Sequence, residues 1–161
     1  MKKILFVCHG NICRSPMAEF ILKEMVREAG LSSDFEISSA AVSTEETGND
    51  MYPPAKRMLQ SKNIPFTRRS ARQISRSDYS YYDYIICMDQ SNIRWMRNII
   101  GENSEQKVSL LLQWINGELI NHHLTNGKMA DVADPWYTGD FSVAYRDIEQ
   151  GCRAILKQLR D

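Results

Sequence analysis

The sequence has no excess of charge, few cysteines and no long apolar stretch. Its 161 residues include 20 lysines and arginines against 20 aspartates and glutamates. Without a positive field over the whole molecule, neither nucleic acid nor a membrane surface is expected as a partner. No run approaches the roughly 20 apolar residues of a membrane span, and the apolar run at residues 4–8 is too short for a signal-peptide core. We therefore expect a cytoplasmic protein whose anion sites, if any, are local.

The cysteine and histidine content argues against a metal centre. Four cysteines are too few for a disulfide-stapled secreted protein, and none forms a CxxC pair of the zinc-binding kind. The adjacent His122 and His123 have no third ligand at a helpful spacing. Neither a metal nor another cofactor is expected, and Cys87 and Cys152 are predicted to pack in the core.

Short apolar runs alternate with helix-like stretches, which is typical of βα units around a parallel sheet. We expect one domain over residues 1–161, because a chain of this length can bury one sufficient core. Strands are predicted at 4–7, 35–38, 84–88 and 108–112, and helices at 16–30, 53–62, 92–100 and about 141–159. The predicted N-caps are Ser15, Ser91 and either Asp140 or Ser142, whereas four tyrosines at 79, 81, 82 and 84 are expected to pack at the entry to a strand.

The loop after the first strand, Cys8-His9-Gly10-Asn11-Ile12-Cys13-Arg14-Ser15, has the features of an anion cradle. A turn here can aim several backbone N–H groups at one point, ahead of the positive end of a helix. The loop lacks both GxxxxGK[ST] and GxGxxG, so a bound nucleotide is not expected.

Two side chains of this loop carry chemistry. The helix N-terminus and Arg14 favour the thiolate form of Cys8, and the planar guanidinium of Arg14 matches two oxygens of a phosphoryl group. Gly10 permits backbone conformations that a Cβ forbids, Asn11 tolerates the left-handed region, and Ser15 can donate a hydrogen bond to the thiolate.

Residues 7–19, Val-Cys-His-Gly-Asn-Ile-Cys-Arg-Ser-Pro-Met-Ala-Glu, resemble the low-molecular-weight protein tyrosine phosphatases. Further matches are Ser39-Ala40, Ala71-Arg72-Gln73, Met88-Asp89 with Ser91-Asn92, and Asp134-Pro135 followed by two aromatic residues. The resemblance implies an α/β fold with a four-stranded parallel sheet flanked by helices on both faces, and no metal. It also implies a phosphotyrosine-containing protein or peptide as substrate, and a monomer or weak dimer.

The resemblance also implies roles for single residues. Cys8 attacks phosphorus, Arg14 clamps the phosphate, and Asp134 protonates the leaving tyrosyl oxygen before acting as base when water cleaves the phosphocysteine. The phosphate-binding loop then comprises His9, Gly10, Asn11, Ile12, Cys13 and Ser15, and the substrate rim comprises Trp136, Tyr137 and Glu45.

The sequence departs from the family pattern at two places. Glu45 or Glu46 stands where a tryptophan is common, and Arg69 stands where many relatives have a histidine bonded to the asparagine of the phosphate loop. These departures leave open how Asn11 is held and which peptides are preferred. The sequence also leaves open whether the acidic residues at 45 and 46 select basic phosphopeptides. Cys13 either packs beneath the loop or traps an oxidised Cys8 as a disulfide.

Three other functions compete. Arginine phosphatases of this type carry a threonine where this chain has Ile12, and arsenate reductases use a close cysteine pair, whereas Cys87 has no partner before Cys152. A non-catalytic phosphopeptide-binding module would tolerate loss of the nucleophile or the acid, and this chain keeps both. The prediction is therefore a protein-tyrosine phosphatase.

Overall fold

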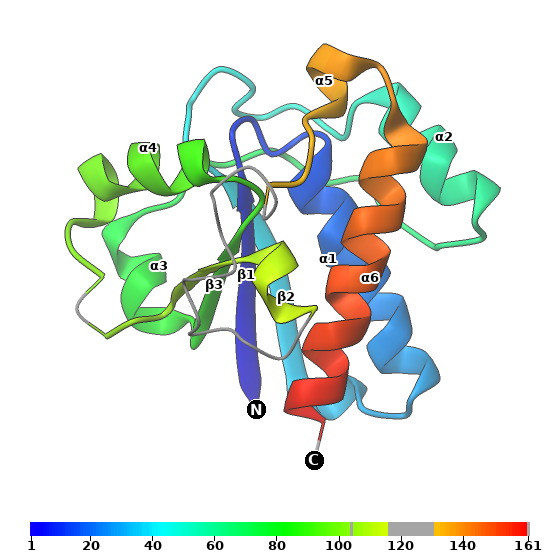
Figure 1. Cartoon of the computed structure of the whole chain (residues 1–161), viewed down its shortest axis with the longest axis horizontal. Helices are drawn as coiled ribbons and strands as arrows, with labels where there is room; N and C mark the ends of the chain where they lie inside the picture. Colours follow the sequence, from blue (N-terminus) through cyan, green and yellow to red (C-terminus); the bar gives the residue numbers. More distant parts are fainter. Residues whose placement is uncertain (104, 116–130, 161) are drawn as a thin grey trace.

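Four parallel strands form the centre of the fold in the computed structural model, which describes residues 1–103, 105–115 and 131–160 (Figure 1). In chain order they are β1 (Lys2–Cys8), β2 (Phe35–Ala41), β3 (Tyr84–Cys87) and β4 (Val108–Leu110), and in the sheet they run β2-β1-β3-β4. Val7 pairs with both Ala40 and Cys87, so the carboxyl ends of the three longer strands lie at one edge of the sheet. The predicted four-stranded parallel sheet is confirmed.

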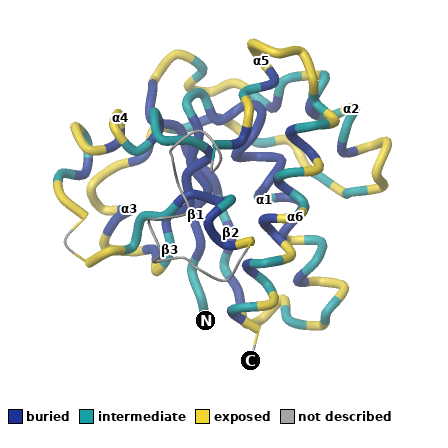
Figure 2. The backbone as a smooth tube through the Cα atoms, in the orientation of Figure 1, coloured by how far each residue is buried: buried dark blue, intermediate teal, exposed yellow. Residues whose placement is uncertain are grey.

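Helices cover both faces of the sheet. On one face lie α1 (Arg14–Glu28), α2 (Pro53–Ser61) and α6 (Phe141–Leu159), and on the other lie α3 (Arg76–Tyr81) and α4 (Gln90–Ile100). Successive residues of a strand point to opposite faces, and β1 follows this rule: Ile4 and Phe6 pack toward α1 and α6, whereas Leu5 and Val7 pack toward α4. The central strands are buried along most of their length (Figure 2). Burial on both faces explains why β1 reads as a continuous apolar run.

The predicted strands and long helices exist, but two predicted N-caps are wrong. Helix α1 begins at Arg14 with Cys13 at the N-cap position and no side-chain cap, and the Ser15 hydroxyl instead contacts Cys8 Sγ and Asn11 Nδ2. Asp89, not Ser91, caps α4 by accepting a hydrogen bond from the Asn92 backbone at 2.9 Å. The last helix, α6, has the predicted Asp140 cap.

The sequence analysis did not predict the short helices of the structure. Helix α3 contains two of the tyrosines that were predicted to pack at a strand entry, and it begins with a capping box in which Asp78 accepts from the backbone of Ser75 at 2.8 Å. Arg72 also donates to Asp78 at 2.9 Å. Burial acts to raise the pKa of Asp78, but these hydrogen bonds outweigh it and hold the pKa below its usual value.

The remaining short elements are η1 (Ser32–Asp34), η2 (Leu111–Trp114), which shortens the predicted fourth strand, and α5 (Pro135–Thr138). The adjacent histidines His122 and His123 lie outside the described residues. None of the described helices combines the length and the apolar character needed to cross a membrane.

Candidate active site

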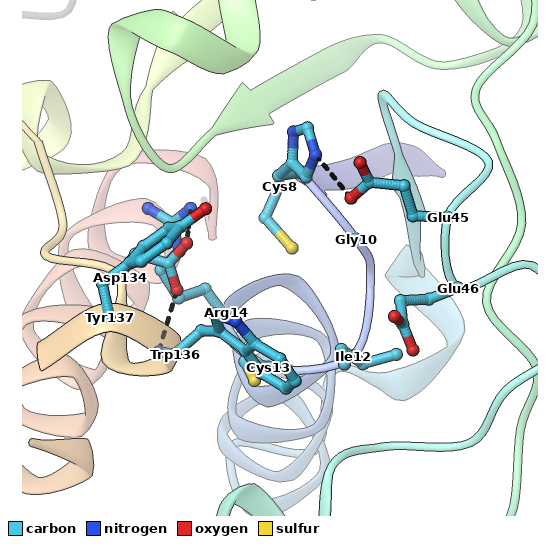
Figure 3. A pocket seen from close by; sticks show the side chains of 11 residues that line it. Cys8, Gly10, Ile12, Cys13, Arg14, Glu45, Glu46, Asp134, Trp136 and Tyr137 are labelled. Carbon is cyan, nitrogen blue, oxygen red and sulfur yellow. Dashed lines mark hydrogen bonds and ion pairs between the residues drawn. The ribbon is translucent and has the colours of Figure 1, made fainter. Parts of the chain in front are cut away.

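A pocket opens at the carboxyl end of β1, where the loop after this strand meets α5 (Figure 3). Its lining residues are Cys8, His9, Gly10, Ile12, Cys13, Arg14, Glu45, Glu46, Asp134, Trp136 and Tyr137. The predicted site residues Asn11 and Ser15 do not line this pocket, because both are fully buried behind the loop. The structure therefore brings nearly all of the predicted site residues to one place.

The sulfur of Cys8 is held by donors from its own loop. The backbone N–H of Asn11 donates to Cys8 Sγ at 3.3 Å, and Ser15 Oγ lies 3.0 Å from the same sulfur. Asn11 has a φ of 61°, which asparagine tolerates better than most residues, and this conformation lets the loop turn its N–H inward. Cys8 itself is only 3% exposed, with its sulfur pointing into the pocket (Figure 3).

The side chain of Asn11 orients these donors. Its Nδ2 donates to Ser15 Oγ at 2.8 Å and to Ser39 Oγ at 3.0 Å. Since Ser15 Oγ accepts this hydrogen bond, its single proton is free to point at Cys8 Sγ. The buried amide thus directs a hydroxyl proton toward the sulfur.

Arg69 holds the other end of the Asn11 amide. Its Nη2 donates to Asn11 Oδ1, which also accepts from the Arg72 backbone at 3.3 Å. Asp50 Oδ1 in turn accepts from the Arg69 backbone at 3.2 Å. Burial lowers the pKa of Arg69, and the nearby Glu19 and Asp50 oppose this effect. The guanidinium of Arg69 therefore holds Asn11, a point that the sequence leaves open.

Arg14 lies at the floor of the pocket and is 2% exposed. Its Nη1 donates to Asp89 Oδ2 at 2.7 Å and to the Val132 carbonyl at 2.8 Å, and its Nη2 donates to Asp134 Oδ2 at 3.3 Å. Burial acts to lower the pKa of Arg14, but Cys8, Asp134 and Asp89 outweigh it and raise the pKa above its usual value. The sequence had given no role to Asp89, since nothing in its local pattern indicates a distant arginine.

Asp134 reaches the pocket from a segment anchored to the sheet. The backbone N–H of Val132 donates to the Met88 carbonyl at 2.9 Å, just after β3. Asp134 then caps α5 by accepting from the Trp136 backbone at 3.1 Å, while its second oxygen faces Arg14. Arg14 and Asp134 are thus fixed relative to each other although 120 residues separate them.

Aromatic side chains form one side of the mouth. Trp136 is 52% and Tyr137 83% exposed, and together they are called the aromatic rim below. The Trp136 ring packs against Tyr52 with centroids 4.8 Å apart, which restrains it. The aromatic rim offers an exposed flat surface beside Asp134 (Figure 3).

Acidic side chains lie on the other side of the mouth. Glu45 Oε1 lies 3.0 Å from His9 Nε2, and Glu46 Oε1 accepts from Asn49 Nδ2 at 3.0 Å. A Cβ on Gly10 would lie 3.4 Å from Glu46 Cγ, in van der Waals contact with this wall. The sequence predicts Glu45 at the substrate rim, and both Glu45 and Glu46 line the pocket.

The other cysteines differ from Cys8 in their surroundings. Cys13 is 6% exposed, and burial, reinforced by negative charge at Cys8, raises its pKa to about 12. Cys87 and Cys152 are fully buried, and burial raises the pKa of each, which confirms their place in the core. The structure holds all four thiols free, and its described residues contain no group of side chains suited to hold a metal ion.

Comparisons with known proteins agree with this geometry. The model of the family "Low molecular weight phosphotyrosine protein phosphatase" matches residues 3–161. The low molecular weight protein-tyrosine-phosphatase YfkJ of Bacillus subtilis is 34% identical over 99% of this chain and 97% of its own, and the phosphatase of Rattus norvegicus is 36% identical over 98% and 95%. The crystal structure of YfkJ superposes with a TM-score of 0.88 over 99% of this chain and 95% of its own, at 34% identity.

A second solved structure is the Drosophila arginine phosphatase DARP, which is 28% identical and covers the whole of both chains with a TM-score of 0.83. The match of the family model over almost the entire sequence, with full-length relatives above 30% identity, decides the family. The chain belongs to the low molecular weight phosphotyrosine protein phosphatases.

Proposed function

We propose that this chain hydrolyses phosphotyrosine in proteins or peptides through a phosphocysteine intermediate on Cys8. The observation that carries the proposal is the convergence of Cys8, Arg14 and Asp134 on one pocket. Donors from Asn11 and Ser15 point at the sulfur, so they can stabilise negative charge on it during the transfer.

In the first step Cys8 Sγ attacks phosphorus, and the S–P bond forms as the bond to the tyrosyl oxygen breaks. Asp134 gives its proton to that oxygen, because a phenolate with a conjugate acid of pKa about 10 is a poor leaving group at neutral pH. The guanidinium of Arg14 binds two phosphoryl oxygens throughout the transfer.

In the second step water attacks the phosphocysteine, Asp134 takes its proton, and the S–P bond breaks to release inorganic phosphate. The thiolate of Cys8 is thereby restored. Because Asp89 and the Val132 carbonyl hold Nη1 of Arg14, the guanidinium keeps its orientation even when Asp134 changes its protonation state.

The mouth of the pocket supports phosphotyrosine as the substrate. The aromatic rim provides a surface on which a phenyl ring can stack, and phosphoserine is too short to reach it. Ile12 adds an apolar lining where a threonine is associated with phosphoarginine. Arsenate reduction is not supported, because Cys87 and Cys152 pack on opposite faces of the sheet.

The test compares hydrolysis of matched phosphotyrosine, phosphoarginine and phosphoserine peptides in EDTA. We expect turnover of the phosphotyrosine peptide alone, abolished in Cys8→Ser. In Asp134→Ala, kcat should fall about 100- to 10,000-fold for phosphotyrosine but far less for an aryl phosphate with an acidic phenol, which needs no proton. Preference for phosphoarginine would overturn the substrate assignment, and an active Cys8→Ser variant would overturn the mechanism.

A further inference from the structure

A third exposed aromatic side chain, which the proposed mechanism does not use, lies next to the pocket. Trp95 lies on α4 and is 50% exposed. Its ring centroid lies 5.3 Å from that of His9, in an edge-on arrangement with an interplanar angle of 85°. Since His9 lines the pocket, Trp95 lies one side chain farther out.

His9 is held from two sides. Its Nε2 faces Glu45 Oε1 at 3.0 Å, and its ring contacts Trp95. These three side chains, His9, Glu45 and Trp95, are called the His9 wall here, and they come from the loop after β1, the loop after β2, and α4. Of the three, His9 and Glu45 line the pocket, and Glu45 lies on the side opposite Tyr137 in Figure 3.

The charges at the mouth favour a cationic group. The Glu45 side chain is 67% exposed, so it can accept a further hydrogen bond from outside. Arg14 is 2% exposed and already paired with Asp89 and Asp134. The Glu45 carboxylate is therefore the charged group turned to solvent at this wall, and the half-exposed Trp95 lies beyond His9.

We propose that the His9 wall binds a basic side chain that neighbours the phosphotyrosine in a peptide substrate. The lysine or arginine stacks on Trp95 and pairs with Glu45, a combination of a cation–π contact and an ion pair. When the phosphotyrosine ring occupies the space beside the aromatic rim, residues one or two positions away, about 4–7 Å along the chain, reach the opposite wall. This inference rests on the proposed function and names the preferred substrate class.

The experiment measures kcat and KM for peptides that carry arginine, alanine or glutamate beside the phosphotyrosine, with a small aryl phosphate as reference. The wild type should prefer arginine to alanine by about tenfold in kcat/KM, the combined effect of two modest contacts. In Trp95→Ala this preference should fall to about twofold or less through KM, with Trp95→Phe keeping most of it.

Two further variants separate binding from structural support. Glu45→Gln should weaken the arginine preference and make it less sensitive to salt, since it removes the ion pair. Tyr81→Ala is the matched control, because Tyr81 is 48% exposed but contacts Glu36 at the start of β2, away from the pocket.

Each outcome has one meaning. A wild type that does not distinguish arginine from alanine, or a Trp95→Ala variant that keeps the full preference, overturns the inference and leaves the proposed function standing. Equal losses on the peptides and the aryl phosphate in Trp95→Ala overturn it as well, since Trp95 would then only support the loop. Absence of turnover of the aryl phosphate by the wild type overturns the proposed function, and the inference with it.

Discussion

Replacing Arg69 by methionine removes a guanidinium from behind the phosphate loop while keeping the length of the side chain. The variant leaves Asn11 Oδ1 with only the 3.3 Å hydrogen bond from the Arg72 backbone. Asn11 is fully buried and holds a φ of 61°, so its amide cannot turn to water for compensation. The change therefore acts on the residue that aims both donors at Cys8 Sγ.

The size of the effect follows from the hydrogen bond that is lost. A hydrogen bond to a charged group contributes about 1.5–3 kcal/mol. If the loss falls entirely on the transition state, kcat/KM drops about 10- to 150-fold. If it falls entirely on the folded state, the free energy of unfolding drops by the same amount and Tm by roughly 4–10 °C. Arg69→Lys keeps the charge but loses the planar fork, and an intermediate result is expected.

The assay combines steady-state kinetics on an aryl phosphate with thermal unfolding of the same samples. The matched control is Arg68→Ala, since Arg68 is exposed and its replacement should change kcat/KM less than about threefold. An Arg69→Met variant with wild-type kcat/KM and wild-type Tm would refute the assigned role of Arg69. A loss in both quantities would show how the interaction is shared between folding and catalysis.

Three other predictions test the site and the fold. Iodoacetamide at pH 7 should alkylate Cys8 before Cys13, because burial raises the pKa of Cys13 to about 12 and keeps it a thiol. Peptide mass spectrometry that shows the reverse order of alkylation would contradict this prediction. Asp78→Asn should lower the free energy of unfolding by about 1–3 kcal/mol at pH 7. The folded-state pKa of Asp78 is depressed, so its contribution is present above the unfolded value of about 3.9 and is lost as pH falls through the folded value. Denaturant titrations should therefore show a smaller loss near pH 3, and equal losses at both pH values would count against the argument. Gly151→Ala should lower the free energy of unfolding by about 1–3 kcal/mol, because the new Cβ would lie 2.5 Å from Leu111 Cγ. The double variant with Leu111→Ala should lose less stability than the sum of the two single variants.

Local sequence determined much of the framework. A continuous apolar run at the start of the chain indicated a strand buried on both faces, and the structure confirms it in β1. The loop that follows was predictable as an anion site, because a glycine, an asparagine and a helix start are all encoded within eight residues. Helix caps were less predictable, since Asp89 and Ser91 both suit that position and the choice depended on the path of the backbone.

Only the tertiary structure decided which distant side chains complete the site. Arg69 bonds to Asn11 across 58 residues, and Asp89 holds Arg14 across 75. Trp95 meets His9 from α4, the helix that follows β3. Periodicity reports which face of an element is buried, but it does not report what lies opposite that face. These contacts arise because parallel strands bring their carboxyl ends to one edge of the sheet, where segments that are far apart in sequence must meet.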